Sequence, residues 1–239
     1  MLEMYLTGIK PHSGLTFITG GIAATMQSLG YSTALYLPVQ TGAILKNGKI
    51  VAPDLIFMKY MDKNISAYCS YLYKSKRLCP EVFEEEKMFM DTSLILRDYK
   101  TVCKHHECII MNGLSGLDTP FNKDISEEQF LQNTNFPIVL LASLRNSTLQ
   151  DILDYMINLK SKNLNIRGII LNECPQKSES YDVRRLQKTI ETCTGINVLG
   201  IFPKIENINT CRPEDFICYV LGCTDLEALF NVKIAKLNM

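Results

Sequence analysis

Short apolar runs that recur at intervals too long for hairpins constrain the fold of this chain more than any other sequence feature. Each run has the length and composition of a strand buried on both faces of a sheet. The six runs lie at residues 4–8, 31–39, 108–113, 137–143, 167–173 and 196–203. Patterns typical of helices lie between them, at roughly 15–29, 81–103, 148–162 and 181–193. This alternation predicts an α/β fold with a mostly parallel sheet, right-handed crossovers and helices on both faces.

Two parts of the chain do not follow the alternation. We interpret residues 40–80, which are interrupted by glycines and prolines, as loops around one short helix. The tail from Arg212 predicts one or two helices that cap the sheet, because Pro213 followed by acidic residues suits a helix start. No linker or repeat divides the chain, so we expect one domain over residues 1–239, with 204–239 as a C-terminal helical cap.

Composition excludes several classes of partner. Lysine plus arginine and aspartate plus glutamate number 25 each, so no net charge attracts the protein to nucleic acid or to an anionic membrane. The N-terminus has no basic region followed by an apolar run, and no apolar stretch approaches the ~20 residues that span a bilayer. Nine cysteines without a CxxC pair predict reduced, mostly buried thiols. We therefore expect a soluble cytoplasmic protein.

A glycine-containing loop between the first strand and the first helix is the strongest candidate for chemistry. It reads "GIKPHSGLT" from Gly8 to Thr16. In a P-loop NTPase-like sheet such a loop wraps phosphates with backbone N–H groups and a helix N-terminus, and the Thr16 hydroxyl is placed to coordinate a metal. Leu15 follows Gly14, at the position where a P-loop carries the lysine that neutralises phosphate charge. An ordinary strand–helix turn is the alternative interpretation of the loop alone.

Lys10 is the one cation inside this loop. It stands five residues before Leu15, the spacing at which loops of the deviant Walker A type carry their signature lysine. We predict Lys10 as a substitute phosphate ligand; the alternative is a solvated loop lysine. Pro11, the next residue, removes one N–H donor from the cradle.

Seven segments in order and spacing resemble the dethiobiotin synthetase family. They are "YLTGIKPHSGLT" at 5–16, "YLPVQTG" at 36–42, Asp54, "IIMNGLSGLDTP" at 109–120, "FPIVLLAS" at 136–143, "RGIILNECP" at 167–175 and "LGIFP" at 199–203. The resemblance covers residues 4–203. It implies a homodimer that uses MgATP and carbon dioxide to close a ureido ring on 7,8-diaminononanoate, a small-molecule substrate, through a phosphorylated carbamate.

The resemblance also implies roles for individual residues. The phosphates and the Mg²⁺ ion would be held by Gly8, Gly14, Leu15 (through its backbone) and Thr16. Asp54 would be a second metal ligand, Thr41 would lie near the carbamate, and Asn172 with Pro203 would contact adenine. For Asp54 an alternative is a purely structural acid at a helix N-terminus.

Three departures from the family pattern fall on charged positions. Leu15 and Leu37 stand where the family has lysines, and Asn112 stands where it has a metal-binding glutamate. Phosphoryl transfer depends mainly on charge stabilisation, and loss of one preorganised donor costs about 10²–10³ in rate. Candidate replacement cations are Lys10, Lys46, Arg145 and the cluster Lys74 to Arg77, of which Arg145 is best placed, just beyond a strand end.

Three functions remain open at this point. The first is the family's ATP-dependent reaction at a remodelled site, with Lys10, Thr41 and Arg145 as catalytic residues. The second is a non-catalytic homologue that binds a nucleotide or another small ligand and acts as a regulatory protein. The third is a different ligase or kinase-like reaction on the same scaffold. The lost charges favour the second function, whereas the family resemblance favours the first.

Overall fold

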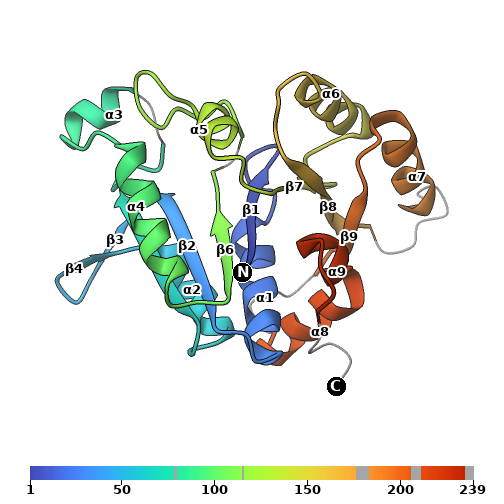
Figure 1. Cartoon of the computed structure of the whole chain (residues 1–239), viewed down its shortest axis with the longest axis horizontal. Helices are drawn as coiled ribbons and strands as arrows, with labels where there is room; N and C mark the ends of the chain where they lie inside the picture. Colours follow the sequence, from blue (N-terminus) through green and yellow to red (C-terminus); the bar gives the residue numbers. More distant parts are fainter. Residues whose placement is uncertain (78–79, 115, 176–182, 206–210, 235–239) are drawn as a thin grey trace.

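A seven-stranded parallel sheet forms the centre of the molecule (Figure 1). The computed structural model describes residues 1–77, 80–114, 116–175, 183–205 and 211–234. Every pairing between neighbouring strands of this sheet is parallel. The strand order across the sheet is β5 (Ser66–Leu72), β2 (Thr33–Gln40), β6 (Cys108–Asn112), β1 (Leu2–Gly8), β7 (Ile138–Ser143), β8 (Ile166–Cys174) and β9 (Val198–Pro203).

Two apolar layers cover the sheet because alternate strand residues point to opposite faces. On β1, Met4 and Leu6 pack in one layer while Tyr5 packs in the other. The first layer is covered by α1 (Leu15–Ser28), α2 (Pro53–Met61), α8 (Pro213–Cys223) and α9 (Leu226–Phe230). The second is covered by α3 (Pro80–Glu85), α4 (Thr92–Cys103), α5 (Glu127–Thr134), α6 (Leu149–Leu159) and α7 (Val183–Thr194). The predicted α/β fold with helices on both faces is confirmed.

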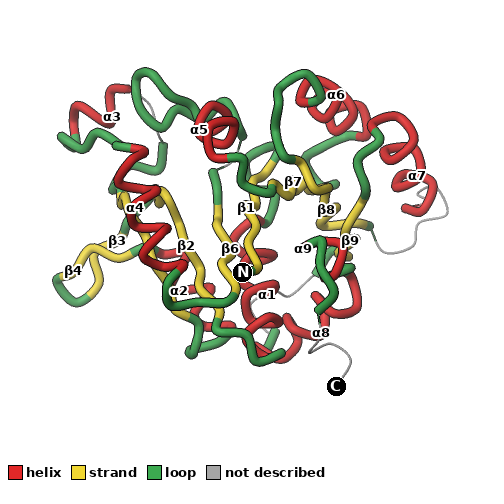
Figure 2. The backbone as a smooth tube through the Cα atoms, in the orientation of Figure 1, coloured by secondary structure: helices red, strands yellow, loops and turns green. Residues whose placement is uncertain are grey.

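The six predicted strands and the helical tail are confirmed, whereas the interpretation of residues 40–80 as loops around one short helix is correct only for the helix, which is α2. This segment contains β5, a full strand of the sheet, and a hairpin of β3 (Ile44–Lys46) and β4 (Lys49–Val51) that projects from the molecule (Figure 2). Asn47 and Gly48 both adopt positive φ at the hairpin turn, as a two-residue type I′ turn requires. β5 lies at the sheet edge and is only half-buried, so its sequence lacks the apolar run of a central strand.

The predicted helix over 81–103 is divided in two. α3 ends at Glu85, Lys87 adopts a φ of +50°, and the Asp91 carboxylate caps α4 by accepting from the Ser93 N–H. The sequence did not predict this break, because the apolar residues on both sides of it continue the helical pattern. A further helix, α5, was not predicted; it begins with a capping box formed by Ser126 and Gln129.

The eight described cysteines form no disulfides with one another, and fewer of them are buried than expected. Among the eight described, Cys108 and Cys174 are buried and the other six are half-buried or exposed. Cys79 lies outside the described residues. Within the described parts of the chain, no helix combines the length and apolar character that crossing a bilayer requires.

Candidate nucleotide site

The loop between β1 and α1 is held in a backbone conformation that favours glycine at one position. Gly14 caps α1 with a φ of +85°, and the N–H of Ile18 donates to its carbonyl oxygen. A Cβ atom at Gly14 would lie 2.2 Å from Nδ2 of Asn172. That amide donates to the Ser13 carbonyl oxygen at 2.8 Å, so the end of β8 fixes the loop. The free N–H groups and positive end of the α1 dipole therefore face the space beyond the strands.

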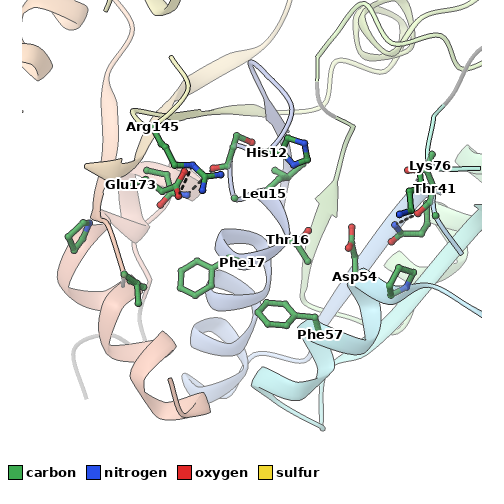
Figure 3. A pocket seen from close by; sticks show the side chains of 18 residues that line it. His12, Leu15, Thr16, Phe17, Thr41, Asp54, Phe57, Lys76, Arg145 and Glu173 are labelled. Carbon is green, nitrogen blue, oxygen red and sulfur yellow. Dashed lines mark hydrogen bonds and ion pairs between the residues drawn. The ribbon is translucent and has the colours of Figure 1, made fainter. Parts of the chain in front are cut away.

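Two adjoining cavities lie at this carboxyl edge of the sheet. The first, of about 730 Å³, extends from the loop to the end of β9, and its size is typical of a small-ligand pocket (Figure 3). The second, of about 540 Å³, extends toward the residues that follow β6. Seven residues line both: His12, Leu15, Thr16, Gln40, Thr41, Asp54 and Lys76. The two cavities therefore meet between the loop, the end of β2 and the start of α2.

Most of the residues predicted for the site line the first cavity. They are Gly14, Leu15, Thr16, Thr41, Asp54, Arg145, Asn172 and Pro203. Gly8 lies behind the loop, where an added Cβ atom would be 2.4 Å from Oγ of Ser13. Its role is to allow the tight turn rather than to line the cavity. Sequence reasoning missed Phe17, Phe57 and Ile205, which supply apolar walls and show no pattern that distinguishes them from core residues.

Thr16 and Asp54 face one another where the cavities meet (Figure 3). Burial raises the pKa of the Asp54 carboxyl, and hydrogen bonding to the side chains of Gln40 and Thr16 acts in the opposite direction. Asp54 also lies in the first turn of α2. Its position therefore fits both a metal ligand and a structural acid at a helix N-terminus. Within the described residues no three acidic, histidine or cysteine side chains form a metal cluster. One carboxylate and one hydroxyl suit Mg²⁺ whose other ligands are phosphates and water.

Lys10 and Arg145, two of the cations expected to replace the missing lysines, are both engaged by carboxylates. Lys10 Nζ lies 3.0 Å from Oδ2 of Asp151, and Lys10 lines neither cavity. Arg145 lines the first cavity, with its Nε 3.4 Å from Oε1 of Glu173. The Glu173 carboxylate also accepts from the Ser143 hydroxyl. The phosphate-ligand roles of Lys10 and Arg145 stay predictions, and each would require an ion pair to open.

The three departures from the family pattern are built into the packing. Leu15 and Leu37 are 8% and 1% exposed and belong to the apolar layer beneath α1. The Asn112 side chain is 5% exposed and accepts a hydrogen bond of 2.8 Å from the Thr19 hydroxyl. Neutral contacts therefore occupy positions where the resemblance would place charges.

A buried acid that sequence reasoning missed supports the second cavity. Glu127, at the start of α5, is fully buried, and its Oε1 accepts from the Leu114 N–H at 3.1 Å. The Leu114 carbonyl oxygen in turn accepts from the Thr7 hydroxyl at 2.9 Å and from the Gly8 N–H at 3.4 Å. A Cβ atom at Gly113 would lie 2.3 Å from Oε1 of Glu127, so glycine allows this approach. These contacts tie the wall of the second cavity to the β1–α1 loop.

Comparison with known proteins identifies relatives that match most of the chain. A family model described as an AAA domain matches residues 3–212. Among curated proteins, the chain is 23% identical over 223 residues to an ATP-dependent dethiobiotin synthetase of Nitrosopumilus maritimus, covering 87% of this chain and 92% of the relative. It is 28% identical over 215 residues to that of Clostridium perfringens, covering 86% and 92%.

Solved structures share the fold at lower identity. A ParA family ATPase from Chlorobium tepidum superposes with a TM-score of 0.57 at 12% identity, covering 91% of this chain and 88% of that one. The cell division ATPase MinD of Pyrococcus furiosus superposes with a TM-score of 0.55 at 14% identity, covering 87% and 86%. Both comparisons concern the arrangement of the sheet and helices.

Proposed function

Because the chain belongs to the AAA domain family and is a divergent relative of the dethiobiotin synthetases, we propose that it binds ATP with Mg²⁺ and catalyses a ring-closing ligation of their type. The observation that carries this proposal is the placement of Thr16 and Asp54. Both residues line the junction of the two cavities, next to the N-terminus of α1. A phosphate that passes from one substrate to the other would need its metal ligands at such a junction. By the same relationship we propose a cytoplasmic homodimer.

The first cavity fits the cofactor in three parts. The N–H groups of residues 14–16 would hold phosphates, and Thr16 with Asp54 would hold the metal ion. Asn172, Pro203 and Phe17 would bind the base at the other end. When bound, ATP would supply the phosphoryl group that activates the carbamate. The chain's own contribution is to orient that group toward the second cavity, where Thr41 lies on the shared wall.

A non-catalytic nucleotide-binding or small-ligand-binding regulatory protein is the second candidate. It is favoured by Leu37 and Asn112, because both side chains are buried in neutral contacts and neither adds charge to the transferred phosphate. In its nucleotide-binding form, this candidate differs from the first only in lacking turnover. Growth without biotin of a strain that lacks dethiobiotin synthetase, when it expresses this chain, would establish the catalytic function; failure to grow despite tight MgATP binding would favour the regulatory one.

Calorimetric titration with ATP, with and without Mg²⁺, tests nucleotide binding. We expect tighter binding with Mg²⁺, and we expect Asp54→Asn to lose most of that difference because a neutral amide is a weak Mg²⁺ ligand. The matched control is Asp154→Asn on the exposed surface of α6, which should bind as the wild type does. Absence of binding up to millimolar nucleotide would overturn the catalytic candidate and leave only a regulatory protein that binds another small ligand. Equal Mg²⁺ dependence in Asp54→Asn would remove Asp54 from the metal site.

A further inference from the structure

Positive charge at the junction of the two cavities comes from a segment far from the phosphate loop in sequence. Lys76 lines both cavities, whereas Arg145 lines only the first and Arg77 only the second. The junction is also where Thr16 and Asp54 lie. A terminal phosphate bound there would have Lys76 on one side and the α1 N-terminus on the other.

Lys76, which belongs to the cluster of candidate replacement cations, is also available for a ligand, in contrast to Lys10 and Arg145. Lys10 and Arg145 are paired with Asp151 and Glu173. Among the residues that the structure describes, none forms an ion pair with the Lys76 ammonium. Nearby cations stabilise the charge of a bound triphosphate, and Leu15 supplies none. An unpaired lysine at this junction can provide that charge.

Hydrogen bonds hold the backbone that leads into Lys76 beside the end of β2. The chain continues from β5 alongside the end of β2, with the Tyr73 N–H donating to Gln40 O at 2.8 Å and the Gly42 N–H donating to Ser75 O at 2.7 Å. The Glu86 carboxylate then accepts from the N–H groups of Lys74 at 3.0 Å and Ser75 at 2.8 Å. The attachment point of the Lys76 side chain is therefore set by hydrogen bonds of the preceding residues, without a ligand.

The start of the Lys76 side chain lies along Gly42. A Cβ atom built on Gly42 would be 3.5 Å from Cγ of Lys76, a distance of ordinary van der Waals contact. Figure 3 shows Lys76 beside Thr41, on the opposite side of the cavity from Arg145. Lysine is a flexible point charge, so its ammonium can follow a phosphate placed over this junction.

We propose that Lys76 is a ligand of the terminal phosphate of the nucleotide and replaces, from the end of β5, the lysine that the β1–α1 loop lacks. The inference rests on the proposed nucleotide binding and adds to it the residue that distinguishes a triphosphate from a diphosphate. The chemical class of the ligand is a polyphosphate with its metal ion, held at the end that adjoins the second cavity.

Calorimetry with MgATP and MgADP on the wild type and on Lys76→Ala tests this. A charge-assisted contact predicts about a tenfold to hundredfold loss of MgATP affinity, a much smaller change for MgADP, and partial retention of affinity by Lys76→Arg. The matched control is Lys74→Ala, two residues earlier in the same anchored segment, whose side chain is exposed and lines neither cavity. Its affinities should equal those of the wild type.

A second variant asks whether the charge itself is what matters. Adding Leu15→Lys to Lys76→Ala returns a lysine to the loop position, and we expect it to recover most of the lost MgATP affinity. Equal MgATP affinity in the wild type and Lys76→Ala would overturn the inference, as would an equal loss for MgATP and MgADP.

Failure of nucleotide binding is distinguished by a probe without a base. If the wild type binds neither ATP nor ADP, the proposed function fails, and magnesium tripolyphosphate then tests Lys76 directly. Binding of tripolyphosphate by the wild type and its loss in Lys76→Ala would keep Lys76 as a polyphosphate ligand. Absence of tripolyphosphate binding by the wild type would overturn both proposals.

Discussion

Replacing Glu127 with glutamine should remove a large part of the pH dependence of folding stability between about pH 4.5 and 7. Full burial raises the pKa of the Glu127 carboxyl from 4.5 to about 7, although the Leu114 N–H and the neighbouring hydroxyls of Tyr5 and Thr7 act in the opposite direction. Since the folded pKa is raised, the folded protein binds this proton more tightly than the unfolded chain does. The protonated Glu127 carboxyl therefore makes its full contribution to the free energy of unfolding below pH 4.5, and this contribution is lost as the pH rises to about 7.

The expected size of this effect is large for one side chain. A shift of this size corresponds to roughly 3 kcal/mol in the free energy of unfolding across the interval. Glutamine is neutral at every pH in this range and its amide oxygen can still accept from the Leu114 N–H. The Glu127→Gln variant should therefore unfold at a denaturant concentration similar to that of the wild type near pH 5 and should be the more stable protein at pH 8.

Urea unfolding of both proteins at several pH values between 4.5 and 8 measures this difference. The control is Glu128→Gln, the next residue, whose carboxylate pairs with Lys162 at 2.6 Å and is only partly buried. This control should retain the pH slope of the wild type. Parallel stability curves for the wild type and Glu127→Gln would show that Glu127 does not hold its proton in the folded state.

The central part of the fold follows from sequence because each central strand is buried on both faces. Strands such as β1 and β7 therefore appear as uninterrupted apolar runs, and the helices between them require parallel pairing. The edge strand β5 was not predicted because it is only half-buried and mixes serines and tyrosines with few aliphatic residues. Its position could be assigned only from its pairing with β2, a contact between distant parts of the chain.

Site residues whose positions depend on the local backbone could be predicted from the sequence. Site residues whose positions depend on long-range contacts could not. Gly14 and Thr16 follow from a strand, a tight turn and a helix start. The pairing of Lys10 with Asp151 requires α6 to lie beside the loop, which no local pattern states. Glu127 lies in a polar segment that resembles an ordinary helix start, and its burial arises only from long-range contacts with Tyr5 of β1 and with Leu114, which follows β6.

Substitution of Gly14 with alanine should be the most damaging single change in the phosphate loop. It would force a side chain into a backbone conformation with a φ of +85° and place a Cβ atom 2.2 Å from Nδ2 of Asn172. The left-handed conformation costs about 1–2 kcal/mol for a non-glycine residue. The loop must also move, which breaks the 2.8 Å bond from Asn172 to Ser13 O at about 1 kcal/mol. We expect a loss of about 2–4 kcal/mol in unfolding free energy, together with loss of MgATP binding because the N–H groups no longer converge.

Gly195→Ala separates the two causes of this loss, because Gly195 has a φ of +67° but no atom within 4 Å of an added Cβ. Urea unfolding should show only the conformational cost in this control, about 1–2 kcal/mol, with MgATP affinity unchanged. Adding Asn172→Ala to Gly14→Ala removes the clashing amide, so the double variant should lose less stability than the sum of the single variants. Strict additivity, or a Gly14→Ala variant no less stable than Gly195→Ala, would show that Asn172 does not determine the loop conformation. The close contact between β8 and the loop would then be incidental, and the N–H groups of α1 would converge through the turn alone.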